Sequence, residues 1–156
     1  MILIKQASWK DLMKVFQFLK MAGKDFPDPY FRVTNKKIDH IRVFARLIKH
    51  LFLNSFQKLA NYSTVMWLAE DRDRVKGVAI VGIRNGKALL HDIYVSRDFR
   101  RRGVGSELLK VVIDFCTRRN YVLGLYVKNN TSAINLYKKN GFKITGSNNG
   151  SIYIEL

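Results

Sequence analysis

The chain has 156 residues, of which 47% are hydrophobic and 26% charged, with ten Gly and two Pro. This length fits one domain over residues 1–156, and the composition excludes collagen-like, low-complexity and largely disordered proteins. The 28 Lys and Arg against 12 Asp and Glu give a net charge of +16, which indicates an anionic partner or a strongly solvated basic surface.

Cellular location is predicted from apolar runs and cysteine. The apolar runs reach only a handful of residues, whereas a bilayer-spanning helix needs about 20, so we expect no membrane contact. The N-terminal stretch carries Lys5 and Lys10 and shows no signal-peptide pattern. Cys116, the one cysteine, leaves neither an internal disulfide nor a cysteine metal cage and is expected to be a packing residue. These features predict a cytoplasmic protein without a metal.

The N-terminal part of the chain predicts one strand and two helices. A strand over 2–6 is followed by Ser8 as the N-cap of a helix that reaches Met21 and ends at Gly23. The prolines of the FPDPY stretch predict a loop, and a longer helix is expected over 37–59. The surface of this second helix carries a basic stripe formed by Arg42, Arg46 and Lys49.

From Thr64 onward the apolar pattern becomes the alternation typical of strands. The segments TVMWLAED, VKGVAIVGI and KALLHDIYV are separated by turn residues, which predicts an antiparallel meander. A helix over 103–119, a strand YVLGLYV, a helix over 131–140 and two closing strands around FKITG and SIYIEL follow. The predicted order is βααβββαβαββ, and no repeat or linker indicates a second domain.

Arginines and glycines gather in the segment SRDFRRRGVGS, between the fourth strand and the third helix. Gly103 and Gly105 let the backbone bend so that its N–H groups converge where the helix dipole is positive. The cationic side chains before them are Arg97, Arg100, Arg101 and Arg102. Guanidinium groups suit phosphate oxygens, so the turn predicts a pyrophosphate or polyphosphate site. Neither a Walker loop nor a dinucleotide fingerprint fits, and a plain basic turn before an ordinary helix is the alternative.

Two motifs in the second half of the chain resemble those of one family. Arg100-x-x-Gly103-x-Gly105 matches an R/Q-x-x-G-x-G/A motif, and NNTSAINLYKKNGFK is similar to an N-x-x-A-x-x-L-Y-x-x-x-G-F signature. The positions in register with the second motif are Asn130, Ala133, Leu136, Tyr137, Gly141 and Phe142. Both motifs and the element order resemble the GNAT superfamily of acyl-CoA-dependent N-acetyltransferases. The resemblance implies the GNAT fold, an α/β (α+β) architecture with a mixed central sheet of about seven strands and four helices.

The resemblance also implies where acetyl-CoA, the expected co-substrate, binds. Its pantetheine arm would lie along the fourth strand at Ile93, Tyr94 and Val95, hydrogen-bonded to the backbone of Ile93 and Val95. Its pyrophosphate would lie on the backbone N–H groups of the arginine-rich turn. The turn residues implied in this binding are Arg100, Arg101, Arg102, Gly103, Val104, Gly105 and Ser106. Asn130 would contact the cofactor, or it serves only as a helix N-cap.

Catalytic roles are implied for a tyrosine and for one of two neighbours on the fourth strand. Tyr137 matches the tyrosine that protonates the departing CoA thiolate in many members, a role that suits a phenol because it keeps its proton at neutral pH. A core tyrosine is the alternative. His91 and Asp92 are the candidate general bases; we expect strand alternation to place them on opposite faces, and we favour His91. The base glutamates of histone-type and N-terminal-type members are replaced by Leu89 and Tyr126.

The function implied is an N-acetyltransferase that moves an acetyl group from acetyl-CoA to an amine by direct attack in a ternary complex. The acceptor would be a small-molecule or peptide amine, and the few acidic side chains between Gly23 and Thr64 favour a neutral or acidic amine over a polyamine. Two alternatives stay open: a basic nucleic-acid-binding module and a non-catalytic acyl-CoA-binding domain of the same fold. A homodimer through the final strand, 152–156, is a further option.

Overall fold

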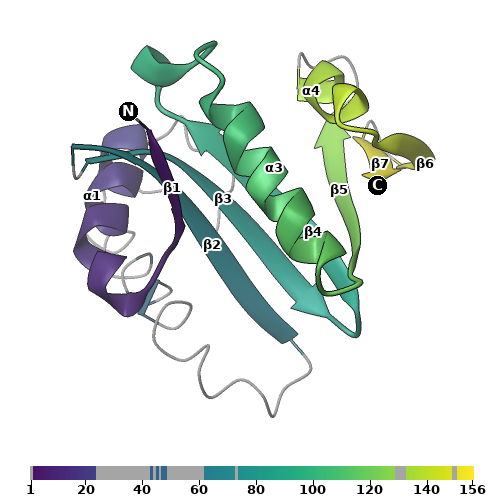
Figure 1. Cartoon of the computed structure of the whole chain (residues 1–156), viewed down its shortest axis with the longest axis horizontal. Coiled ribbons are helices and arrows are strands. Elements are labelled where there is room, and N and C mark those ends of the chain that lie inside the picture. The colour runs from purple at the N-terminus through teal and green to yellow at the C-terminus, as the bar shows by residue number, and fades with distance from the viewer. Residues whose placement is uncertain are drawn as a thin grey trace.

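The computed structural model describes residues 2–23, 62–72, 74–128, 133–148 and 151–156, together with Val43, Ala45, Leu47 and Ile48. Its strands form one seven-stranded sheet in the order β1-β2-β3-β4-β5-β7-β6 (Figure 1). The strands are β1 (Leu3–Gln6), β2 (Tyr62–Asp71), β3 (Arg74–Arg84), β4 (Lys87–Val95), β5 (Val122–Lys128), β6 (Lys143–Asn148) and β7 (Ser151–Glu155). Neighbours are antiparallel except β4 and β5, which are parallel. The predicted mixed sheet of an α+β protein is confirmed.

Helices connect the strands at the predicted places. The structure describes α1 (Leu12–Ala22), α3 (Val104–Thr117) and α4 (Ala133–Lys139), with 3₁₀ turns η1 (Trp9–Asp11) and η5 (Arg97–Phe99) before α1 and α3. The helix expected over 37–59 lies mostly outside the described residues, of which Val43, Ala45, Leu47 and Ile48 are helical. Its basic stripe of Arg42, Arg46 and Lys49 also lies outside them. No helix in the described part of the chain is long and apolar enough to cross a membrane.

Each face of the sheet has its own buried core. On one face, Val15 and Leu19 of α1 pack with Leu68 of β2 and Ile80 of β3, and all four side chains are at most 1% exposed. On the other face, α3 crosses β3 and β4, as Figure 1 shows. Because both faces are covered, β3 is buried almost from end to end, which explains its continuous apolar run.

The second core is centred on α3. Leu108 and Val112 of this helix are fully buried and pack with Ala79 and Val81 of β3. Alternate residues of β3 therefore belong to alternate cores, as the two-residue period of a strand requires. β4, beside β3, is held between the two helical layers.

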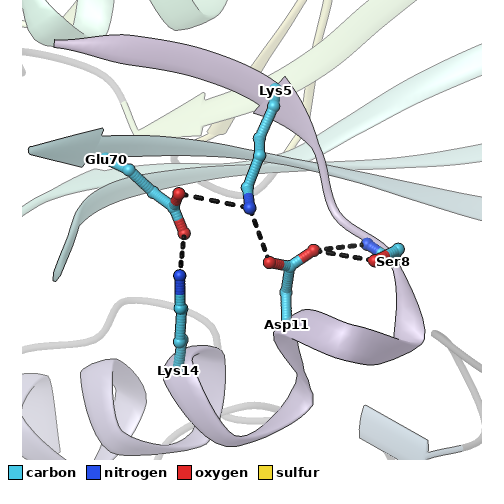
Figure 2. Close-up of polar contacts among 5 residues, drawn as sticks. All are labelled: Lys5, Ser8, Asp11, Lys14 and Glu70. Carbon is cyan, nitrogen blue, oxygen red and sulfur yellow. Dashed lines mark hydrogen bonds and ion pairs between the residues drawn. The ribbon is translucent and has the colours of Figure 1, made fainter. Parts of the chain in front are cut away.

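A buried ion-pair network fixes the N-terminal strand to the sheet and to α1 (Figure 2). Asp11 Oδ2 accepts hydrogen bonds from the backbone N–H and the hydroxyl of Ser8, both at 2.9 Å, so Ser8 begins the first turn as predicted. Lys5 Nζ lies 2.7 Å from Asp11 Oδ1 and 3.2 Å from Glu70 Oε2, and Lys14 Nζ lies 3.7 Å from Glu70 Oε1. The network joins β1, β2 and α1 through two carboxylates that are buried.

The Asp11 carboxylate is stabilised in its charged form. Burial alone would raise its pKa, but the hydrogen bonds from Lys5 and Ser8 outweigh burial and hold the pKa below the ordinary value. A carboxyl whose pKa is lower in the folded chain than in the unfolded chain stabilises the fold above the unfolded value of about 4. That contribution is lost as pH falls through the folded pKa.

We predict that Asp11→Asn lowers the free energy of unfolding by about 1–3 kcal/mol at pH 7. The substitution removes the ion pair between Asp11 and Lys5, so that Lys5 keeps only Glu70 as an ion-pair partner among the described residues, and it weakens the cap at Ser8. The difference from the parent should shrink as pH falls below about 4, where Asp11 itself becomes protonated. Urea unfolding at pH 7, 5 and 3 measures both effects. Glu107→Gln is the control: Glu107 pairs with Lys110 at 2.8 Å on an exposed surface, so its loss should cost less than about 0.5 kcal/mol. Equal effects of the two variants at pH 7 would contradict the prediction.

Candidate functional site

β4 and β5 are paired only where they begin, and then they diverge. The parallel ladder joins Lys87–Leu89 of β4 to Val122–Gly124 of β5. Beyond it, β5 continues with β7 as its partner and β4 continues with β3 as its partner, and Figure 1 shows the two strands separating toward α4. Among the described strands, none pairs with the free side of β4 after Leu89. This edge can accept an extended ligand as an additional strand.

Every second residue of β4 directs its backbone N–H and C=O groups to this open edge. The Ser96 N–H donates to the Lys76 carbonyl at 2.8 Å, so Ser96 faces β3. By antiparallel alternation Tyr94 also faces β3, whereas the N–H and C=O groups of Ile93 and Val95 face the opening. Ile93 and Val95 are the two residues whose backbone the sequence resemblance assigns to pantetheine. Tyr94 was also predicted to bind the cofactor. Its backbone groups face β3, and its ring packs against Phe18 on the α1 face, with ring centroids 5.8 Å apart.

A β-bulge in β4 changes the placement of the two candidate bases. Asp92 pairs with Ile80 and Leu90 pairs with Val81, so His91 is the extra residue of the bulge. Leu90 and Ile93 both pack on the α3 face, and the two residues between them therefore fall on the α1 face. The expectation that His91 and Asp92 lie on opposite faces is wrong, because the bulge interrupts the alternation. His91 is exposed, whereas Asp92 is half-buried and its Oδ2 atom is buried.

Tyr137 of α4 lies close enough to Asp92 for the two groups to interact. Its side chain is 8% exposed and its ring packs edge-on against Phe142, with centroids 5.7 Å apart. Gly141, at a φ of +91°, ends the helix and turns the chain so that Phe142 folds back onto Tyr137, which explains the spacing of the L-Y-x-x-x-G-F motif. Burial, and then the negative charge of Asp92, raises the pKa of Tyr137 to about 12. The phenol therefore keeps its proton throughout the physiological pH range.

The first turn of α3 places backbone donors above the same stretch of β4. Gly103, at a φ of +82°, is the N-cap, and the first helical bond runs from the Glu107 N–H to its carbonyl at 3.0 Å. The helix itself therefore leaves the N–H groups of Val104, Gly105 and Ser106 without acceptors. A Cβ added to Gly105 would lie 3.8 Å from Val95 Cγ2 and 4.0 Å from Ile93 Cγ2, so this turn covers the two strand residues that face the opening.

Two of the predicted arginines are held at the end of β4 by side-chain contacts. Arg100 Nε donates to the Val95 carbonyl at 3.0 Å, and its guanidinium carbon lies 5.5 Å from the Tyr94 ring centroid. Arg102 lies over Phe99 at 5.3 Å, while Arg101 is exposed at a φ of +58°. The structure thus gathers the predicted turn around one end of the open edge. Asn130 lies outside the described residues, so its predicted contact stays a prediction.

Sequence reasoning missed one cation beside this turn. Lys76 of β3 contacts the same Phe99 ring as Arg102, with its ammonium 4.5 Å from the ring centroid. Nothing in the sequence separates it from the other lysines, because its importance comes from the pairing of β3 with the end of β4. Cys116, by contrast, is 1% exposed as expected of a packing residue, and burial raises the pKa of its thiol to about 11.

Comparison with known proteins decides the family. The Acetyltransferase (GNAT) family profile matches residues 24–142, which is more than half of the chain. The chain belongs to the GNAT acetyltransferase family. It is 40% identical over 63 residues to streptothricin acetyltransferase A of Bacillus subtilis (strain 168), a match that covers 38% of this chain and 36% of that protein. It is 27% identical over 97 residues to the alpha-tubulin N-acetyltransferase of Plasmodium vivax (strain Salvador I), covering 53% of each.

This GNAT chain therefore spans about a third to a half of the length of the curated relatives that it matches. The fold is similar over its full length to that of the PaiA N-acetyltransferase from Thermoplasma acidophilum in complex with coenzyme A. That match has a TM-score of 0.71 and 20% identity, and it covers 99% of this chain and 98% of the other. The predicted GNAT fold is confirmed, and family membership supports acyl transfer as the class of reaction.

We predict that Gly103→Ala weakens acetyl-CoA binding by about 10-fold, because the substitution strains the left-handed cap and turns the N–H groups of α3 away from the phosphates. Calorimetric titration measures the affinity. Gly86→Ala is the matched control: Gly86 has a φ of +74° in the β3–β4 turn, and a Cβ at either glycine meets nothing within 4 Å. Both variants should lose about 1–2 kcal/mol of stability, but only the first should lose affinity. Equal affinities of the two variants would argue against a phosphate site at this turn.

Proposed function

We propose that the protein is an N-acetyltransferase that transfers the acetyl group of acetyl-CoA to an amine by direct attack in a ternary complex. The observation that supports this best is the meeting of three separate features at the opening between β4 and β5. These features are the outward-facing backbone of Ile93 and Val95, the N–H groups at the start of α3, and the protonated Tyr137 beside Asp92. The coenzyme A complex of a structurally similar GNAT protein supports the choice of co-substrate.

In this proposal, the pantetheine arm extends the sheet at the free edge of β4. Ile93 and Val95 would donate their N–H groups to its amide carbonyls, and the Val95 carbonyl would accept from one of its amide N–H groups. Arg100 Nε also donates to that carbonyl at 3.0 Å, which holds the guanidinium beside the start of α3, where the pyrophosphate would bind.

The groups near the His91 bulge can be assigned to the bond changes of the reaction. The acceptor amine attacks the thioester carbonyl, a strand N–H stabilises the oxyanion, and the carbon–sulfur bond breaks as the tetrahedral intermediate collapses. With a pKa of about 12, Tyr137 donates a hydrogen bond to the departing sulfur more readily than it gives up a proton. An alkyl thiol has a pKa of about 8.5, so the hydrogen bond stabilises the thiolate until solvent protonates it.

Asp92 is our candidate for the group that receives the proton of the attacking amine. It interacts electrostatically with Tyr137, whereas His91 is exposed at the bulge. If kcat/KM of the parent rises with pH near about 6.5 and a His91→Gln variant loses this rise, His91 and not Asp92 is the base.

We predict that Tyr137→Phe lowers kcat by about 100-fold and changes the acetyl-CoA affinity by less than about 2-fold, because the hydroxyl acts only on the leaving sulfur. In the parent, kcat should show no falling limb from this phenol below about pH 11. Steady-state release of CoA thiol with a panel of amines, together with calorimetry, gives both quantities. Tyr121→Phe is the control and should keep full activity, because Tyr121 follows the C-terminal end of α3, where its ring packs against Phe115. A fully active Tyr137→Phe variant would contradict the proposed role, and a parent that binds acetyl-CoA but acetylates no amine would indicate a non-catalytic domain.

A further inference from the structure

Two adjoining cavities lie on the α1 face of the sheet, between α1, the start of β3 and the end of β4. One has a volume of about 270 Å³ and the other of about 360 Å³. Phe18, Met21, Val75 and Lys76 line both of them, so the two cavities are neighbours, and we call them together the α1 groove. It lies on the face of the sheet opposite α3, and the start of the arginine-rich turn, from Ser96 to Phe99, forms part of its lining.

The walls of the α1 groove combine apolar surface with positive charge. Phe18 and Val75 are almost fully buried, and Tyr94 belongs to the lining of the cavity nearer to the turn. The cationic side chains of the lining are Lys14, Arg74, Lys76 and Arg97. Asp98 is the one acidic side chain among the described lining residues. A ligand that fits this lining has both apolar and negatively charged groups.

The groove begins beside the proposed reaction centre. Tyr94, in its wall, follows Asp92 by two residues and lies on the same face of β4. Successive residues on one strand face are about 7 Å apart, and Ser96, which also lines the groove, is about 7 Å further along β4. When the amine of an acceptor reaches Asp92, the part of the acceptor about 7–14 Å from that amine would therefore lie in the α1 groove.

We propose, on the basis of the function proposed above, that the α1 groove binds the acceptor and that the acceptor is a peptide with acidic residues two to four positions after its free amine. An extended peptide rises about 3.3 Å per residue, so these positions span the groove from Tyr94 to Ser96. Lys76 would supply positive charge for the carboxylates: it lines both cavities, and its ammonium lies 4.5 Å from the centroid of the Phe99 ring. The apolar walls accept the intervening side chains. A nucleic acid strand has neither the aliphatic amine nor the apolar side chains that this arrangement uses.

Peptide affinity tests the proposal without requiring turnover. The probes are the peptide Ala-Phe-Glu-Leu-Glu-Gly, with a free N-terminal amine and a neutral C-terminal fluorophore, and the same peptide with Gln in place of Glu. Fluorescence anisotropy with the full chain and saturating CoA should show about 10-fold tighter binding of the acidic peptide at low salt. Lys76→Glu should remove most of that preference and leave the Gln peptide within about 2-fold of its parent affinity. Arg74→Glu, at the other cavity, should act in the same direction.

Lys87→Glu is the matched control, because it makes the same change in charge at the opposite end of β4 and should alter either affinity by less than about 2-fold. Equal binding of the two peptides, or equal effects of Lys76→Glu and Lys87→Glu, would overturn the proposal. If a single-stranded oligonucleotide binds more tightly than the acidic peptide, and Lys76→Glu abolishes that binding, the groove binds nucleic acid and the proposal is wrong. A failure of acetyl-CoA to bind in calorimetry would count against the acetyltransferase function and is measured separately from these peptide affinities.

Discussion

The end of pairing between β4 and β5 is the constraint on which the candidate site depends. Two features meet at this point. The His91 bulge follows Leu89, the last residue of β4 that pairs with β5, and a bulge bends and twists the strand that contains it. On β5, Gly124 is the last paired residue, and its missing side chain leaves the space that the Tyr153 ring occupies. The free edge of β4 therefore arises from specific residues on both strands.

Three sets of groups gather around this edge because other contacts hold them there. The packing of α3 against β3 carries its N-terminal turn over Ile93 and Val95. The turn at Gly141 returns Phe142 to Tyr137, and burial keeps the phenol protonated. The network of Lys5, Asp11 and Glu70 fixes α1 to the opposite face of the sheet, which leaves the α1 groove beside the end of β4. In the proposed function, cofactor and acceptor would approach one bulge from two sides.

The sequence predicted the parts of the site that depend on local pattern. Glycine spacing and arginine content predicted the turn before α3, because such turns are set by short-range backbone geometry. Tyr137 was predicted from the resemblance of the L-Y-x-x-x-G-F motif to the GNAT signature, and its catalytic role stays a prediction. The bulge was missed, since a two-residue period assumes an uninterrupted ladder, and the relative positions of His91 and Asp92 were therefore wrong. The interaction of Asp92 with Tyr137 and the position of Lys76 over Phe99 depend on contacts between distant segments, for which a single sequence gives no signal.

Amide hydrogen exchange of β4 with and without acetyl-CoA, resolved by residue with NMR, tests the central claim most directly. If the pantetheine arm is added to the sheet at the free edge, the N–H groups of Ile93 and Val95 should become strongly protected on binding. The Tyr94 N–H already faces β3 and should change little. Binding of acetyl-CoA without protection at Ile93 and Val95, or equal protection of all three amides, would contradict the account.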